Sequence, residues 1–236
     1  LDIEHMFDIV ACPQIGVRLG IEGVTAADVA APSAVGREGP DFLELRPGHI
    51  TELTGVPGAG LTRLGLRLLA PHSRRATVVA LDSRGWISPE AAWETGVLAE
   101  RLIVVRCADS SLWPKVTAAL LEGVRAMYAE VPAGVRESDL RRLAALTRAR
   151  RVAVALRSMG GGLPGGVAFL RLRALGVTWE GANSGHGKLT RRRLLLEASG
   201  KGAAGTTRRF EVEDEGTDDV RVVSDVVVDQ ARRTVG

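Results

Sequence analysis

The chain has 236 residues, of which 45% are hydrophobic, 25% charged and 4% aromatic, and its formal net charge is +3. This composition excludes a disordered chain, a collagen-like chain and a disulfide-stabilised scaffold, and the length suffices to bury one sizeable core. No apolar run approaches the roughly 18 residues that a membrane-spanning helix needs. Two isolated cysteines, Cys12 and Cys107, are typical of a reducing, cytoplasmic setting.

Charge is distributed unevenly along the chain. Residues 136–209 carry 16 basic and 4 acidic side chains, whereas residues 1–50 and residues 210–236 each have a net charge of −5. A basic segment between two acidic ones is expected where arginines contact phosphate, or where the acidic ends fold back onto them. Solvated surface arginine is the plainer alternative.

The predicted elements follow an arm and linker at residues 1–40, which contains three prolines. From residue 41 onward, short apolar runs of the kind found in buried strands alternate with amphipathic stretches of helical period. In chain order we expect strands at 50–53, 77–81, 102–105, 124–130 and 152–156, and helices at 61–70, 88–98, 113–123 and 137–150. This alternation predicts a parallel sheet flanked by helices.

Beyond the last of these strands the pattern changes. A glycine-rich segment at 160–166 predicts a mobile loop or a sharp turn. The strands expected at 168–173, 192–198 and 207–212 have no helices between them, which favours antiparallel pairing. The fold class is therefore α/β, with a mostly parallel sheet and antiparallel strands at its C-terminal end.

The end of the chain forms the third predicted region. We expect the core to occupy residues 41–213 and an acidic, valine-rich tail to occupy residues 214–236. The apolar run 220–228 in this tail has to be covered, either as a last strand of the sheet or by a partner.

The segment between the first predicted strand and the first predicted helix has the spacing of a phosphate loop. Gly55 and Gly60 occupy the glycine positions of the pattern G-x-x-x-x-G-K-[ST], Leu61 replaces the lysine, and Thr62 keeps the hydroxyl. In a working loop, backbone N–H groups hold the phosphates, the lysine spans them and the hydroxyl binds magnesium. The segment predicts a degenerate phosphate loop; a glycine-rich turn unrelated to nucleotide binding is the alternative.

The surrounding sequence resembles the RecA family of ATPases. Residues 45–55 are similar to the turn and strand that lead into the family's phosphate loop, and residues 78–105 to the strand–helix–strand stretch that follows. Residues 124–130 resemble the Walker B strand, with Glu130 at its acidic end. The resemblance spans residues 42–213 and implies a RecA-like core.

Three positions depart from that family. RecA-type enzymes place a catalytic glutamate where this chain has Arg84, and a γ-phosphate-sensing glutamine where it has Arg157. Together with Leu61 in place of the lysine, these replacements remove the family's means of neutralising the γ-phosphate and activating water. We therefore expect no catalysis and no bound cofactor, with at most weak binding of ATP and magnesium.

RecA-like chains that have lost this site resemble the ImuA-type accessory proteins of bacterial damage-induced mutagenesis. The resemblance implies an adaptor in SOS mutagenesis and translesion DNA synthesis that contacts an ImuB-type inactive Y-family polymerase homologue. By the RecA resemblance, the N-terminal segment mediates self-association and the C-terminal segment is left for the partner. Two alternatives remain: a divergent nucleotide-dependent recombination or repair ATPase, and a SulA-like regulatory binding protein.

Arginines near the end of the core form the densest basic cluster. Because successive residues of a strand face opposite ways, Arg191 and Arg193 share a face that Arg192 does not. We predict weak, electrostatic DNA contact through Arg157, Arg191, Arg193 and Arg208, the alternative being solvated charge.

The remaining candidate residues favour structure over chemistry. Trp93 and Trp113 have spacings that suit the core, whereas Trp86, in the loop after the second core strand, is expected to be exposed. The four histidines are scattered, so no metal spacing exists, and no serine has the G-x-S-x-G context of a hydrolase.

Overall fold

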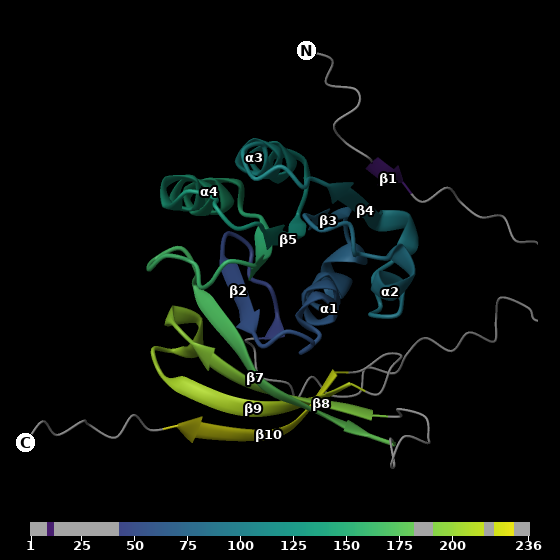
Figure 1. Ribbon diagram of the computed structural model, residues 1–236, viewed down its shortest axis with the longest axis vertical. Helices are drawn as coiled ribbons and strands as arrows, with labels where there is room; N and C mark the ends of the chain where they lie inside the picture. The colour runs from purple at the N-terminus through teal and green to yellow at the C-terminus, as the bar shows by residue number, and fades with distance from the viewer. Residues whose placement is uncertain (1–8, 12–42, 182–190, 215–219, 229–236) are drawn as a thin grey trace, which may run out of the picture.

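A ten-stranded sheet organises the part of the chain that the structure, a computed structural model, describes: residues 9–11, 43–181, 191–214 and 220–228 (Figure 1). Its strands are β1 (Ile9–Ala11), β2 (Ile50–Gly55), β3 (Val78–Asp82), β4 (Leu102–Arg106), β5 (Ala126–Val131), β6 (Ala153–Ser158), β7 (Leu170–Glu180), β8 (Arg191–Ser199), β9 (Thr207–Asp214) and β10 (Val220–Val228). The helices are α1 (Leu61–Ser73), α2 (Pro89–Trp93), α3 (Trp113–Gly123) and α4 (Glu137–Arg150), with 3₁₀ turns η3 (Ala99–Arg101) and η4 (Lys201–Ala203).

The strand order is β1-β4-β3-β5-β6-β2-β7-β8-β9-β10. From β4 to β7 in this order, neighbouring strands are parallel. From β7 to β10 each strand is antiparallel to the next, and β1 is antiparallel to β4. This confirms the predicted α/β class with antiparallel strands at its C-terminal end.

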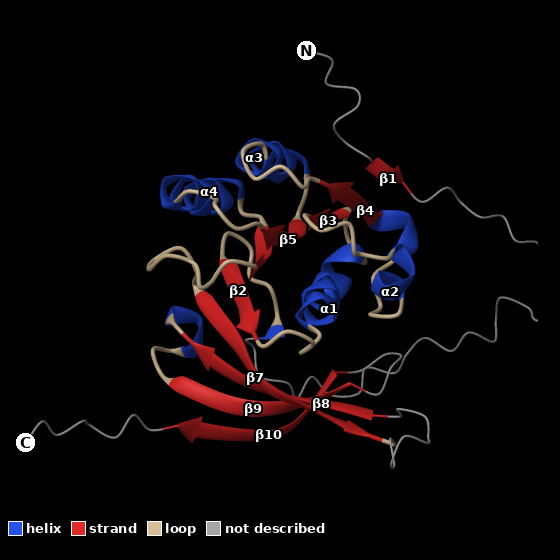
Figure 2. Ribbon diagram, viewed as in Figure 1, coloured by secondary structure: helices blue, strands red, loops and turns tan. Residues whose placement is uncertain are grey.

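Helices cover both faces of the parallel strands, which explains why these strands are continuous apolar runs (Figure 2). On β5, Tyr128 packs into the core on the side of α1, whereas its neighbour Met127 packs into the core on the side of α3 and α4. All residues of β3 and β5 are buried. Trp113, at the start of α3, is fully buried, as the sequence predicts.

Two helices differ from their predicted bounds. Helix α2 ends at Trp93 instead of 98, because the chain turns at Gly96, which has a φ of +85° and donates its N–H to the carbonyl of Trp93 at 2.8 Å. Helix α1 continues three residues beyond the predicted end, to Ser73. The hydroxyl of Ser73 donates to the carbonyl of Ala70 at 2.8 Å and accepts the N–H of Leu98 at 3.1 Å. This pair of hydrogen bonds joins the end of α1 to the end of the α2 segment.

The sheet extends past both predicted boundaries of the core. Strand β10 pairs with β9 along Val220–Val228. The valine-rich run is therefore a last strand of the sheet, the first of the two alternatives that the sequence left open. Strand β1, in the predicted arm, pairs with β4 at the opposite edge. Strand β7 continues to Glu180, seven residues beyond its predicted end, and there it pairs with β8.

Within the described residues, no helix combines the length and the apolar character that a bilayer crossing demands. Nor do three or more His, Cys, Asp or Glu side chains of this part gather closely enough to hold a metal ion.

The contact between Gly65 of α1 and Tyr128 of β5 gives a test of this packing. A Cβ at position 65 would lie 2.2 Å from a ring carbon of Tyr128. Although alanine forms helices better than glycine by about 1 kcal/mol, we expect Gly65→Ala to lower the free energy of unfolding by about 1–3 kcal/mol because the core is overpacked. Urea denaturation measures this change.

Gly123 at the end of α3 is the matched control, because a Cβ there meets no atom within 4 Å. Gly123→Ala should leave the stability unchanged or raise it by about 0.5–1 kcal/mol. Equal stabilities for the two variants would show that α1 does not pack against β5 as described.

Candidate functional site

The predicted strand–turn–helix arrangement is present at the phosphate-loop segment. Strand β2 ends at Gly55, and α1 begins at Leu61. Gly60 caps the helix in the left-handed conformation, with a φ of +72°, and its carbonyl accepts the N–H of Leu64 at 3.0 Å. Because a left-handed φ favours glycine, this residue type fits the turn.

Leu61, at the lysine position, points into the protein core. Its side chain is 3% exposed and belongs to the apolar core on the α1 side of the sheet. Position 61, from which a phosphate-loop lysine acts, therefore holds a buried apolar side chain instead of a cation.

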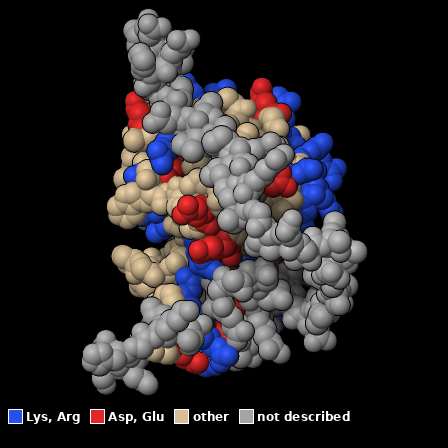
Figure 3. All heavy atoms as spheres, turned by 90° about the vertical axis from the view of Figure 1, so that its right-hand side faces the viewer, with Lys and Arg blue, Asp and Glu red and all other residues tan. Residues whose placement is uncertain are grey.

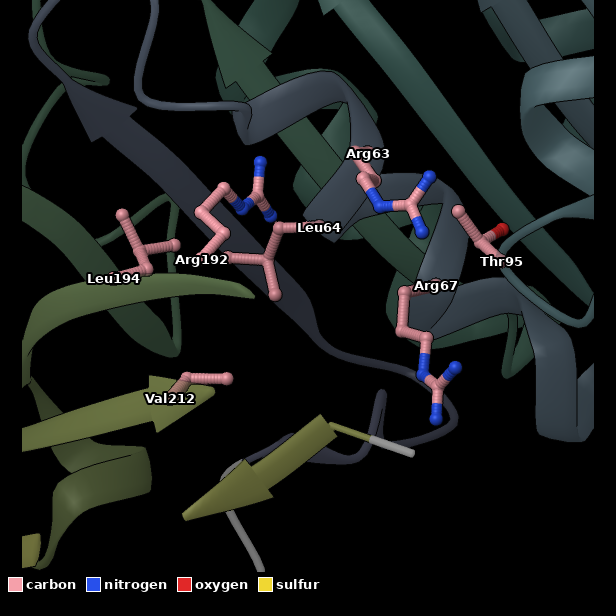
Figure 4. Close-up of a pocket in the computed structure, with 7 residues that line it drawn as sticks. All are labelled: Arg63, Leu64, Arg67, Thr95, Arg192, Leu194 and Val212. Atoms are coloured by element: carbon pink, nitrogen blue, oxygen red, sulfur yellow. The ribbon is translucent and has the colours of Figure 1, made fainter. Parts of the chain in front are cut away.

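Arg192 lies directly against the same turn. A Cβ on Gly60 would lie 1.8 Å from one guanidinium nitrogen of Arg192. The side chain is buried, reaching from β8 toward Leu64 of α1 (Figure 4). Sequence reasoning placed Arg192 on the face opposite to Arg191 and Arg193, which the structure confirms, but missed its contact with the loop.

Four residues, Thr62, Arg84, Glu130 and Arg157, meet beside the loop, and we call them the arginine–glutamate cluster. Arg84 donates two hydrogen bonds to the Glu130 carboxylate, through Nε at 3.0 Å and through Nη2. Nη1 of Arg157 lies 3.6 Å from the same carboxylate. The hydroxyl oxygen of Thr62 accepts from Arg157 and, at 3.4 Å, from Arg84.

The fold positions each member of this cluster. Glu130 and Arg157 are register partners on the adjacent strands β5 and β6. Arg84 follows β3 in a loop that Asp82 organises, because this buried carboxylate accepts the N–H groups of Arg84, Gly85 and Ile87 at 2.8–3.0 Å. The carboxyl ends of three neighbouring strands thus supply the charged members of the cluster, and α1 supplies Thr62.

Hydrogen bonding and burial shift the pKa of Arg84 and that of Tyr128 beside the cluster. The Glu130 side chain is fully buried, and its hydrogen bond raises the pKa of Arg84, so the guanidinium stays protonated. Tyr128 lies beside Glu130, with its hydroxyl 3.5 Å from the carboxylate, and burial strongly raises its pKa, so it remains a neutral phenol. Within the cluster, two guanidinium groups face one carboxylate, and the buried carboxylate of Asp82 also attracts Arg84.

These residues do not fit the magnesium ion that a working phosphate loop holds. Magnesium takes oxygen ligands such as hydroxyl, carboxylate and water. The Thr62 oxygen already accepts from two guanidinium groups, and the Glu130 oxygens accept from Arg84. A divalent cation at Thr62 would meet two positive charges at short range, which is unfavourable.

The residues predicted to contact DNA lie in three separate places. Arg157 belongs to the arginine–glutamate cluster, whereas Arg208 lies opposite Ala198 on the α1 side of the sheet. Arg191 and Arg193 share the other face of β8, as predicted. DNA contact through these residues stays a prediction.

Carboxylates on the neighbouring strands pair with the two arginines of that face. Glu180 lies 3.5 Å from Arg191 and 3.2 Å from Arg193, and Glu213 lies 3.0 Å and 2.9 Å from them. On the face that Figure 3 presents, acidic side chains likewise lie between basic ones. A phosphate would therefore compete with these carboxylates for the arginines.

A buried carboxylate that sequence reasoning missed anchors the glycine-rich loop. Glu52 of β2 accepts the N–H of Leu163, and its other oxygen lies 3.1 Å from Arg171 of β7. Arg171 also donates to the carbonyl of Leu163 at 2.9 Å. Burial raises the pKa of Glu52 despite these partners. The loop at 160–166, which the sequence predicts to be mobile or sharply turned, is thus held to the sheet through Leu163 at its centre. The only sequence signal for this contact is the acidic Glu52 within an otherwise uncharged strand.

The fold is RecA-like α/β, and the segment with phosphate-loop spacing lies between β2 and α1, where such a loop is expected. The crystal structure of the RadB recombinase is similar to this chain, with a TM-score of 0.53 and 17% identity, covering 75% of this chain and 93% of that one. No curated protein matches the chain. The family model described as the MT3502 N-terminal domain matches residues 40–161, more than half of the chain, so the chain belongs to that family. The matched region contains the whole arginine–glutamate cluster.

Restoring the lysine should damage the core. Because the Leu61 side chain is buried among apolar residues, we expect Leu61→Lys to lower the free energy of unfolding by about 2–4 kcal/mol. Leu61→Met, which conserves volume, should cost less than about 1.5 kcal/mol. Thermal or urea unfolding compares the two, and a fully stable lysine variant would mean that position 61 faces solvent.

The coupling between Arg84 and Glu130 can be measured with a double-mutant cycle. Truncating either partner breaks a partly buried ion pair, so we expect a coupling energy of about 1–3 kcal/mol for Arg84→Met and Glu130→Gln. The exposed pair Arg141–Glu137 on α4 is the matched control, with an expected coupling of about 0.5 kcal/mol or less. Similar couplings for the two pairs would contradict the cluster.

Proposed function

We propose that this protein is a RecA-like adaptor that does not hydrolyse nucleotide. We further propose that it acts as an ImuA-type accessory protein in damage-induced mutagenesis and translesion DNA synthesis. Its partner in this role is an ImuB-type inactive homologue of Y-family polymerases, and it functions by protein–protein contact.

The observation that carries the loss of catalysis is the arginine–glutamate cluster. A RecA-like ATPase needs a carboxylate free to accept a proton from water and a cation free to meet the γ-phosphate. Here Arg84 replaces the first group and itself binds the buried carboxylate of Glu130. The buried Leu61 stands where the cation that meets the γ-phosphate would be expected.

The role in mutagenesis is supported by the resemblance of a RecA-like chain without its catalytic side chains to the ImuA-type proteins. A divergent recombination or repair ATPase is the competing candidate, favoured by the structural similarity to a recombinase. The two candidates differ in one measurable property, the turnover of ATP.

We expect the purified protein to release no phosphate from ATP above the background of a Glu130→Ala variant, with or without single-stranded DNA. Leu61→Lys should not create turnover, because the water-activating carboxylate is still missing. Steady-state phosphate release measures both. Clear turnover that Glu130→Ala abolishes would support the ATPase candidate and overturn ours.

The adaptor role is tested with the partner itself. The full chain should form a complex with the ImuB-type protein of the same organism in size-exclusion chromatography, without added nucleotide. Cells that lack this chain should lose DNA-damage-induced mutations and regain them with a Leu61→Met copy. Absence of the complex together with unchanged mutation frequency would refute the role.

A further inference from the structure

Exposed large apolar side chains gather at one edge of the sheet. Among the described residues, five such side chains are at least one-third exposed: Val56 49%, Trp86 72%, Leu98 36%, Met159 36% and Trp179 47%. Val56, Trp86 and Met159 directly follow or lie just beyond the carboxyl ends of β2, β3 and β6, and Trp179 lies near the carboxyl end of β7. Because these strands are parallel, Val56, Trp86 and Met159 belong to the same edge, the one that carries the loop at Gly55–Gly60. Trp179 lies further along β7, beyond Ala174, the register partner of Gly55.

An arginine joins each of these tryptophans to the loop. The guanidinium carbon of Arg84 lies 4.4 Å from the ring centroid of Trp86, and that of Arg192 lies 5.8 Å from the ring of Trp179. Arg84 donates to the hydroxyl of Thr62 at 3.4 Å, on the first turn of α1.

On the other side of the loop, Arg192 lies against Gly60, as described above. The contacts therefore run without interruption from Trp86, through the degenerate loop, to Trp179. We call Val56, Trp86, Met159 and Trp179, with Arg84 and Arg157 between them, the loop-edge surface.

The composition of the loop-edge surface suits a protein partner. Tryptophan, methionine and arginine are the residue types enriched at protein interfaces, and tryptophan and arginine dominate their binding energy. Val56 and Met159 offer no ring on which a nucleic-acid base could stack. Arg84 already covers one face of the Trp86 ring.

The charge of this surface indicates what the partner supplies. The arginine–glutamate cluster brings two arginines to this surface, and their side chains are partly exposed, 23% for Arg84 and 15% for Arg157. A carboxylate is the complementary group, because guanidinium binds it with charge-assisted hydrogen bonds.

We infer that the loop-edge surface is the face through which this chain binds its protein partner, and that the partner presents an acidic side chain flanked by apolar ones. The inference rests on the proposed function, since it identifies the contact surface of the proposed adaptor. The edge at which a RecA-like ATPase holds nucleotide thus becomes a binding site for an acidic–apolar protein segment.

The test measures the dissociation constant of the full chain and the ImuB-type protein by biolayer interferometry. Trp86→Ala combined with Trp179→Ala should weaken binding about tenfold or more, as expected for truncated hot-spot tryptophans. Leu98→Ala is the matched control, because this side chain is exposed but precedes β4 at the opposite edge, and it should bind like the unaltered chain. Binding should also weaken as salt is raised, since a carboxylate–guanidinium contact contributes.

The outcomes separate the two claims. If the unaltered chain does not bind the ImuB-type protein, the proposed function fails and the inference fails with it. If the unaltered chain binds and the double-tryptophan variant binds equally well, with the same melting temperature, only the inference is overturned. Two parallel assays, binding of a labelled single-stranded oligonucleotide and sedimentation of the chain alone, should be unaffected by the variant. Selective loss of oligonucleotide binding or of self-association, with partner binding intact, would assign the surface to nucleic acid or to a second copy and so refute the inference.

Discussion

The carboxylate of Glu130 is the constraint on which the site depends. It lies fully buried at the carboxyl end of a central strand, where an uncompensated charge would be strongly unfavourable. Arg84 satisfies it with two hydrogen bonds, and Arg157, its register partner on β6, adds a second cation. Both arginines then bind Thr62, so the first turn of α1 is joined to three neighbouring strands. Asp82 completes the arrangement by holding the loop that presents Arg84.

This internal compensation explains how the buried carboxylate of Glu130 is tolerated at the carboxyl ends of the strands of a RecA-like fold. The carboxyl edge of an open α/β sheet is where such folds bind ligands, because strand ends and helix N-termini meet there. In this chain, Arg84 and Arg157 bind Glu130 and Thr62 at that edge. The same edge carries the exposed Trp86, with Trp179 near the end of β7, and the partly exposed side chains of Arg84 and Arg157.

The sequence predicted the elements whose periodicity is strong, and α3 and α4 have the predicted bounds because their apolar positions repeat without interruption. The sequence also identified Arg84 and Arg157 as departures from the RecA-family pattern. It did not predict that both would share Glu130, because that depends on strand order, which a linear pattern does not contain. The contact of Arg192 with Gly60 and the pairing of Glu52 with Arg171 were missed for the same reason. Each joins residues more than a hundred positions apart through the register of the sheet.

The central claim is that side chains of this chain, and not a nucleotide, complete the site around Thr62. Hydrogen–deuterium exchange of the full chain, with and without saturating magnesium and ATP, tests this most directly. The account predicts unchanged exchange in the peptides that contain residues 55–64 and 82–87, since the cluster is complete without a ligand. Protection of both segments by magnesium and ATP would contradict it, because it would mean that nucleotide binds in the loop and displaces the arginines.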